Sequence, residues 1–346
     1  MDTFRDIGHM QAKHVGTLGL RKRNRFLMMI GIVLFSLLLN AAASPAETRE
    51  FVTNLPKDFL PEGVEWDGSN SRFLLSSIRK NKIVAVDPAN GQASNFAKAP
   101  GSVLGIHVKG NSVWGVWTQF GHGFENNRGT RITAWSLTDN THLGDWPLPT
   151  KDPRANLGDF LIVDSNTIVA SDSGTGAVWK LDTRNHQYKP VVPAGKFRSP
   201  QGLAPGRLAG TIYLADYPSG LWRVSLTDGE ATQLAAPGGS ELRGIDGLYR
   251  RGDQLIAVPN GTKIPRIIMI TLGENDVITD VRALLELRGG SDEPSLGTLL
   301  NDTFWFVANG QWSQYDGDLK PKTDATLQPP LLRAVSLDAK ALPPPR

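Results

Sequence analysis

The chain has 346 residues, 40% of them hydrophobic, with 36 Gly and 23 Pro; so many chain breakers exclude a mainly helical protein and favour an all-β domain with a large core. The net charge is +3, but residues 1–46 hold six Lys or Arg and two Asp, so the remainder lies near −1 and gives no support to nucleic-acid binding. The chain contains no Cys, which excludes disulfides, thiolate metal sites and cysteine nucleophiles.

The N-terminal segment has the pattern of a secretory signal. Basic residues at Arg21 to Arg25 precede an uncharged run from Phe26 to Leu39, and small residues follow up to Ala46. We expect a signal peptide over residues 1–46, with cleavage after Ala43 or Ala46 and a periplasmic or secreted product. Because a spanning helix needs roughly 20 apolar residues, this run of 14 is short for one, and an uncleaved anchor is the alternative.

Six short segments recur at intervals of about 42 to 54 residues, and they begin at Pro61, Val103, Leu157, Pro200, Ile245 and Ser295. Each is followed by two strand-like runs, such as TIYLADY and GLWRVSL in the fourth copy, and usually by a weaker third run. Four strands per unit at this period are typical of a propeller blade. The sequence therefore predicts a six-bladed β-propeller of four-stranded antiparallel blades over residues 47–338.

The last repeat has no obvious fourth strand, whereas the strand-like run from Arg49 has no blade of its own. We expect this N-terminal strand to complete blade six and close the ring. Polar, Gly- or Pro-rich excursions are predicted at Gln119–Thr130 and Asn309–Pro330, with a loose tail at residues 339–346.

The first residues of the inner strands should project into the central channel. These positions are Glu62, Leu104, Gly158 or Asp159, Gln201, Asp246 and Leu296. The second strands end at the same face, with Asp172, Asp216, Asn260 and Asn309. Oxygen-bearing side chains gathered there suit a hard divalent cation. The alternative is that the channel groups hydrogen-bond water and the strand-end groups form turns.

Three of these positions carry a resemblance to a known family. The motifs Pro61-Glu62-Gly63, Pro200-Gln201-Gly202 and Ile245-Asp246-Gly247 resemble those of the gluconolactonase, regucalcin and luciferin-regenerating-enzyme family. The resemblance implies a six-bladed propeller with one divalent cation held by Glu62, Gln201 and Asp246. Calcium is the first expectation, with manganese, magnesium and zinc as alternatives. Gln201 departs from the family, which has asparagine there.

The resemblance also implies an activity, the hydrolysis of a sugar lactone or a similar cyclic ester. Asp246 would take the proton of the attacking water, and Arg154 and Asp159 would bind the substrate. The expected partner is a small-molecule substrate of a monomeric enzyme, with no nucleic acid and no membrane contact after signal removal. The alternative is a non-catalytic propeller that binds a small molecule or a protein on the same face, because one fold hosts many functions.

Histidine and tryptophan are two further residue types with a candidate role. His122, in the first excursion, is a candidate base over the channel mouth, although no partner histidine accompanies it. Most of the nine Trp fall within the strand-like runs and are predicted to pack in the core.

Overall fold

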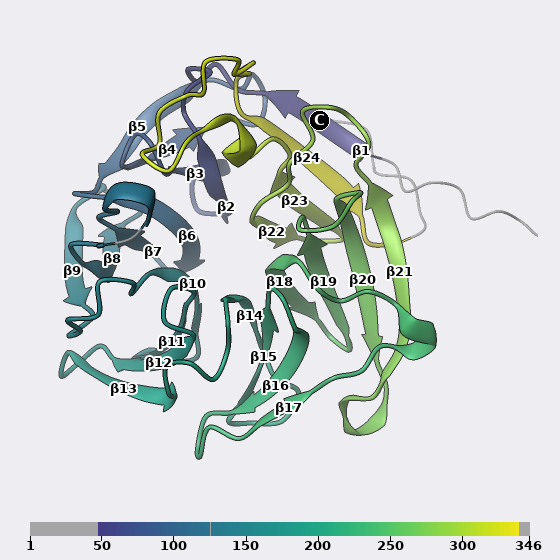
Figure 1. Ribbon diagram of the computed structural model, residues 1–346. Helices are drawn as coiled ribbons and strands as arrows, with labels where there is room; N and C mark the ends of the chain where they lie inside the picture. The colour runs from purple at the N-terminus through teal and green to yellow at the C-terminus, as the bar shows by residue number, and fades with distance from the viewer. Residues whose placement is uncertain (1–47, 125, 339–346) are drawn as a thin grey trace, which may run out of the picture. The chain divides into compact units, whose positions relative to one another are not determined.

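The computed structural model describes residues 48–124 and 126–338, which form six four-stranded antiparallel sheets arranged around a common axis (Figure 1). This confirms the predicted six-bladed β-propeller. The expected signal segment and C-terminal tail lie outside the described residues. Within the described ranges, none of the helices has the length and apolar character needed to cross a bilayer.

The first three blades follow the chain from the inner to the outer strand. Blade one contains β2 (Pro61–Asp67), β3 (Arg72–Ser77), β4 (Lys82–Val86) and β5 (Ala93–Lys98). Blade two contains β6 (Ser102–Lys109), β7 (Ser112–Thr118), β8 (Thr130–Ser136) and β9 (His142–Pro147). Blade three contains β10 (Leu157–Ile162), β11 (Thr167–Asp172), β12 (Ala177–Asp182) and β13 (Gln187–Val192).

Blades four and five have the same strand order, whereas blade six combines both ends of the chain. Blade four contains β14 (Pro200–Pro205), β15 (Thr211–Asp216), β16 (Gly220–Ser225) and β17 (Ala231–Gln233). Blade five contains β18 (Ile245–Arg251), β19 (Gln254–Pro259), β20 (Arg266–Leu272) and β21 (Ile278–Glu286). Blade six contains β22 (Gly297–Leu300), β23 (Thr303–Val307), β24 (Leu331–Ser336) and β1 (Thr48–Val52).

The helical content of the described chain is limited to short 3-10 turns. They are η1 (His122–Phe124), η2 (Pro237–Gly239), η3 (Glu274–Asp276) and η4 (Trp312–Gln314). η1 lies in the first predicted excursion and η4 in the second, so each excursion contains one turn beside a long connection between strands.

The burial of the strands explains why their sequences differ. The second strands β3, β11, β15 and β19 are buried from their second residue to their last, as expected where sheets pack on both faces. Each contains an uninterrupted apolar run that begins at its second residue. The outer strands β5 and β13 are mostly exposed or half-buried and carry Asn, Lys and Gln. The weak fourth run of each repeat is therefore the outer edge of a blade.

The N-terminal strand pairs antiparallel with β24, from Thr48 opposite Val335 to Val52 opposite Leu331. Phe51 contacts an aromatic ring in each of two blades. Its ring centroid lies 6.0 Å from that of Phe73 in blade one and 5.9 Å from that of Trp305 in blade six. β1 is thus the outer strand of blade six and packs against blade one.

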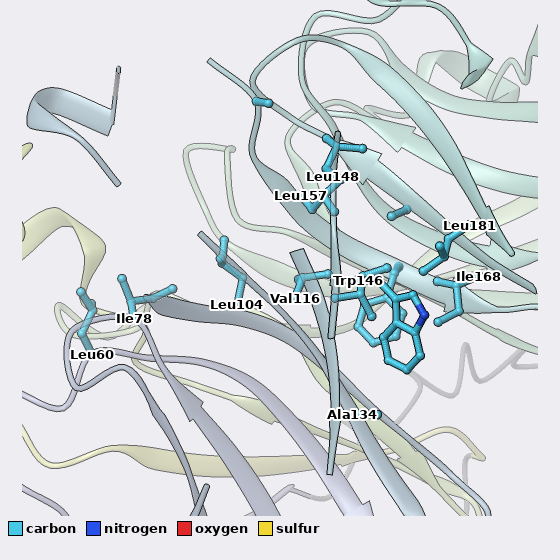
Figure 2. Packing of buried hydrophobic residues seen from close by; sticks show 14 of the residues in the cluster. Leu60, Ile78, Leu104, Val116, Ala134, Trp146, Leu148, Leu157, Ile168 and Leu181 are labelled. Atoms are coloured by element: carbon cyan, nitrogen blue, oxygen red, sulfur yellow. The ribbon is translucent and has the colours of Figure 1, made fainter. Parts of the chain in front are cut away.

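Buried apolar side chains connect neighbouring blades. One cluster joins Leu60 and Ile78 beside blade one to Leu104 and Val116 of blade two and to residues of blade three, including Leu157 (Figure 2). Trp146 of β9 lies close to Ile168 and Leu181 of blade three in the same cluster (Figure 2). Tyr315, from the second excursion, also belongs to it, so this excursion is anchored on the first blades.

The residue pairs that begin the inner strands lie in β-bulges. The pairing register shifts between Pro61 and Val64 in β2, between Pro200 and Leu203 in β14, and between Ile245 and Leu248 in β18. A bulge leaves a residue outside the ladder and changes the direction of its side chain. The bulges therefore explain how Glu62, Gln201 and Asp246 reach the channel.

The glycine inside two of these bulges is required by close contact between blades. A Cβ on Gly63 would lie 2.9 Å from the backbone oxygen of Leu104 in blade two. A Cβ on Gly202 would lie 2.6 Å from the backbone oxygen of Asp246 in blade five. Glycine therefore recurs in these motifs because each of the two inner strands packs closely against the next inner strand.

Candidate functional site

A cavity of about 330 Å³ lies at the channel end where the inner strands begin. Every channel position predicted from the repeats lines it, namely Glu62, Leu104, Gly158, Asp159, Gln201, Asp246 and Leu296. The remaining lining residues are Phe120, Phe124, Asn156, Ser173, Tyr217, Asn260, Glu293 and Trp312. The structure therefore brings together the three ligands implied by the family resemblance.

Glu62 is held by a residue from the far end of the chain. Its side chain is buried, and the indole Nε1 of Trp312 donates a hydrogen bond of 2.7 Å to its Oε2. Burial and the negative charge of Asp246 raise the pKa of Glu62 well above its usual value, despite the hydrogen bond from Trp312. The two acidic groups thus repel each other across the cavity.

Asp246 is oriented by Asn260. The amide Nδ2 of Asn260 donates a hydrogen bond of 2.8 Å to Asp246 Oδ2 and another of 2.9 Å to the backbone oxygen of Pro294. Its Oδ1 accepts a hydrogen bond of 2.9 Å from the Tyr217 hydroxyl, so the amide is fixed on both sides. Burial raises the pKa of Asp246 to about 7; the hydrogen bond from Asn260 opposes this shift and the charge of Asp159 adds to it.

Gln201 is oriented by a residue of its own strand region. Its Nε2 donates a hydrogen bond of 2.8 Å to Ser199 Oγ. The amide oxygen Oε1 lies 3.6 Å from the point that a Cβ on Gly158 would occupy, on the cavity wall. The longer glutamine therefore still presents its oxygen at the cavity.

Asp159 belongs to a partly buried ion network that runs down the channel from the cavity. Its Oδ1 lies 3.0 Å from His107 Nε2, and His107 Nδ1 lies 3.2 Å from Glu65 Oε2. The hydroxyl of Thr298 donates a hydrogen bond to Glu65 Oε1. Although burial opposes a positive charge, the hydrogen bonds to Asp159 and Glu65 raise the pKa of His107 to about 10. His107 is therefore a cation between two carboxylates.

Arg154 lies away from the cavity lining. Its side chain is 64% exposed and makes an ion pair of 2.6 Å with Asp152, two residues earlier. The structure thus separates Arg154 from Asp159, the other residue predicted to bind substrate.

The strand-end residues divide between two roles. Asn260 lines the cavity, whereas Asp172, Asp216 and Asn309 bind nearby backbone groups. Asp172 Oδ1 accepts hydrogen bonds from the amides of Asn156 and Thr175, and Asp216 Oδ1 accepts from those of Arg198 and Ser199. The amide of Leu331 donates to Asn309 Oδ1. The turn and loop interpretation therefore fits three of the four.

His122 does not line the cavity. Its side chain is 89% exposed, and its Nδ1 lies 2.6 Å from Asp318 Oδ1 of the second excursion. This contact ties the two excursions together outside the cavity.

The sequence did not predict four of the residues that line the cavity. Three of them, Phe120, Phe124 and Trp312, form an aromatic wall, and the fourth is Glu293. Phe120 and Phe124 come from the first excursion, and Trp312 from the second. The ring centroids of Phe120 and Phe124 are 5.1 Å apart, and those of Phe124 and Trp312 are 5.9 Å apart. The three aromatic residues lie outside the repeated motifs, and their only sequence signal is their place in the two excursions predicted to lie over one face of the ring. Glu293 lies outside both excursions and carries no such signal.

The oxygen atoms that line the cavity are of the chemical type that binds a hard cation. No described residue donates a hydrogen bond to Glu62 Oε1, Gln201 Oε1 or Asp246 Oδ1. In each of these side chains the other polar atom is hydrogen-bonded. All three are oxygens, the ligands that calcium and magnesium prefer. Within residues 48–124 and 126–338, no group of three or more His, Cys, Asp or Glu side chains is arranged to hold a metal ion. The candidate set accordingly depends on the amide of Gln201 for its third ligand.

Comparison with known proteins identifies the fold. No protein-family model matches the chain, and no curated protein matches it in sequence. Among solved structures, luciferin-regenerating enzyme matches with a TM-score of 0.58 at 14% identity, covering 86% of this chain and 97% of that chain. Regucalcin from Agrobacterium tumefaciens gives 0.58 at 11% identity, over 86% and 97%. A gluconolactonase from Xanthomonas campestris gives 0.55 at 13%, over 85% and 91%. The structure thus resembles the family suggested by the motifs, at identities that establish the fold alone.

Proposed function

We propose that the protein is a metal-dependent hydrolase that opens a sugar lactone or a similar cyclic ester in the propeller channel. One observation carries this proposal: Glu62 Oε1, Gln201 Oε1 and Asp246 Oδ1, from three different blades, line one cavity without hydrogen-bond partners among the described residues. Oxygen atoms of carboxylate and amide groups are the ligands that hard divalent cations prefer in proteins. A divalent cation would satisfy all three.

Glu62, Gln201 and Asp246 would hold the cation, which supplies a Lewis acid that polarises an ester carbonyl. The structural resemblance to a regucalcin described as calcium-binding supports calcium first, with manganese, magnesium and zinc as alternatives. Trp312 and Asn260 keep Glu62 and Asp246 in position through the hydrogen bonds given above.

Asp246 is the proposed general base. Burial raises the pKa of Asp246. A cation held beside it would oppose this rise, so that Asp246 would act as a carboxylate that accepts a proton from water. As the water oxygen bonds to the carbonyl carbon, its proton passes to Asp246. The ring C–O bond then breaks, and the leaving oxygen takes up a proton to give a hydroxy acid. Phe120 and Phe124 contribute apolar surface to the cavity wall.

A non-catalytic propeller that binds a ligand at the same cavity is the second candidate. It is favoured because no three His, Cys, Asp or Glu side chains among the described residues are placed to hold one metal ion, and such a group would be the stronger sign of a catalytic metal. We also propose export, because Arg21 to Ala46 has the composition of a signal peptide.

The test is acid release from a panel of sugar and aliphatic lactones. Chelator-treated protein should be inactive, and calcium or manganese should restore turnover. Asp246→Asn should lower kcat by at least about a hundredfold, since general-base catalysis contributes on that order. Asp228→Asn, at an exposed turn of blade four, is the control and should retain full activity. Turnover that survives both the chelator and Asp246→Asn would contradict the proposed mechanism.

A further inference from the structure

All the charged side chains that line the cavity are negative. Four carboxylates line the cavity, Glu62, Asp159, Asp246 and Glu293, and no Lys, Arg or His side chain does. A divalent cation would balance Glu62 and Asp246, and His107 already balances Asp159. Among the four lining carboxylates, only that of Glu293 is then left without a balancing cation. Glu293 would therefore repel an anionic ligand and attract a cationic one.

Glu293 is held rigidly beside the aromatic wall. The backbone amide and the hydroxyl of Ser313 donate hydrogen bonds of 3.1 Å and 2.8 Å to its two carboxylate oxygens. The backbone amide of Glu293 donates a hydrogen bond of 2.9 Å to the backbone oxygen of Ala308, the residue before the second excursion. Ser313 follows Trp312 directly in η4, so one turn fixes the carboxylate and the indole together.

The three aromatic residues that line the cavity with Glu293 are of the kind that binds organic cations. Trp312 contacts Phe124 edge to face, Phe124 contacts Phe120 in the same way, and all three rings line the cavity. Aromatic faces next to a carboxylate attract ammonium groups through cation–π and ionic interactions, and desolvation in a cavity strengthens both. A compact metal ion would gain little from the rings, whereas an alkylated ammonium would contact them.

We propose that Glu293, Trp312 and Phe124 form a subsite for an ammonium group, so that the ligand of this cavity is an organic cation. For the substrate, this means a cyclic ester that carries a protonated or quaternary amine. That extension rests on the proposed function, but the binding of the ammonium group does not depend on catalysis or on the metal.

The experiment compares choline with its uncharged carbon isostere 3,3-dimethylbutan-1-ol. Binding to the full-length protein is followed by tryptophan fluorescence and calorimetry, with chelator and with calcium, at fixed ionic strength. We expect choline to bind at least about tenfold more tightly than the isostere, which corresponds to about 1.4 kcal/mol. Equal affinities, or no binding of choline, would overturn the proposal.

Two variants locate the ammonium site. Glu293→Gln keeps an acceptor for Ser313 but removes the charge, and we expect it to lower choline affinity about tenfold while leaving the isostere unaffected. Glu274→Gln, an exposed position in η3, is the matched control. Unchanged choline affinity in Glu293→Gln would overturn the proposal. Calcium binding without choline binding would refute the ammonium subsite alone, and choline binding without lactone turnover would refute the hydrolase alone.

Discussion

Trp312 donates a hydrogen bond of 2.7 Å to Glu62 across 250 residues of sequence. The bond joins a turn between β23 and β24 to the bulge that begins β2, the first inner strand. The same indole contacts Phe124 from the other excursion. The cover of the cavity and the proposed metal ligand are therefore parts of one contact network.

Replacing Trp312 by Phe should weaken cation binding without unfolding the protein. Phenylalanine keeps a ring against Phe124 but cannot donate to Glu62, so the carboxylate loses the group that orients it. Loss of a partner of a metal ligand costs about 10- to 100-fold in metal affinity, and we expect a loss in that range for calcium. Calorimetry measures it, with Trp222→Phe in blade four as the control; equal affinities of Trp312→Phe and wild type would contradict this role.

The partly buried ion network of Asp159, His107 and Glu65 predicts a specific pH dependence of stability. Because the pKa of His107 is raised from 6.5 to about 10 in the folded protein, its contribution to stability is complete below pH 6.5 and is lost as the pH rises to about 10. Within that window the group contributes a slope of up to about 1.4 kcal/mol per pH unit.

Urea unfolding of wild type and His107→Gln between pH 6 and 10 tests this dependence. The stability difference between the two proteins should be largest at pH 6 and should shrink as the pH rises. A difference that stays constant over the whole range would show that His107 is neutral in the folded protein.

The repeats predicted which residues of the inner strands line the cavity. Glu62, Gln201 and Asp246 could be predicted because each precedes a glycine in an inner strand, and the bulges and close blade contacts explain that pattern. Trp312 and Glu293 could not be predicted, because they lie outside the repeated strands and their positions depend on long-range contacts such as those to Glu62 and Ala308.

Arg154 fits the sequence motif of the family but does not line the cavity. Its place just upstream of the third inner strand agrees with the family pattern, but Asp152, two residues before it, forms an ion pair with its guanidinium. A charged neighbour such as Asp152 decides where a long side chain points. A motif that leaves this neighbour out cannot predict that direction. Asp172 and Asp216 show the same effect, since each binds backbone amides of its own blade.

The pairing of β1 with β24 predicts that the N-terminal strand closes the ring. Phe51 contacts Phe73 and Trp305, so Phe51→Ala should remove packing between blades one and six and lower the free energy of unfolding by about 2 kcal/mol. Val52→Ala, on the exposed side of the same strand, should change it by less than about 0.5 kcal/mol. Urea denaturation checks both, and similar effects of the two substitutions would argue against closure through β1.

The most direct test of the cation site is calorimetric titration of calcium into the chelator-treated protein, alongside Glu62→Gln and Asp246→Asn. We predict a single calcium site in the wild type and a loss of affinity of more than about tenfold in each variant, because each loses a charged oxygen ligand. Absence of binding to the wild type, or binding that neither substitution weakens, would contradict a cation held by Glu62, Gln201 and Asp246.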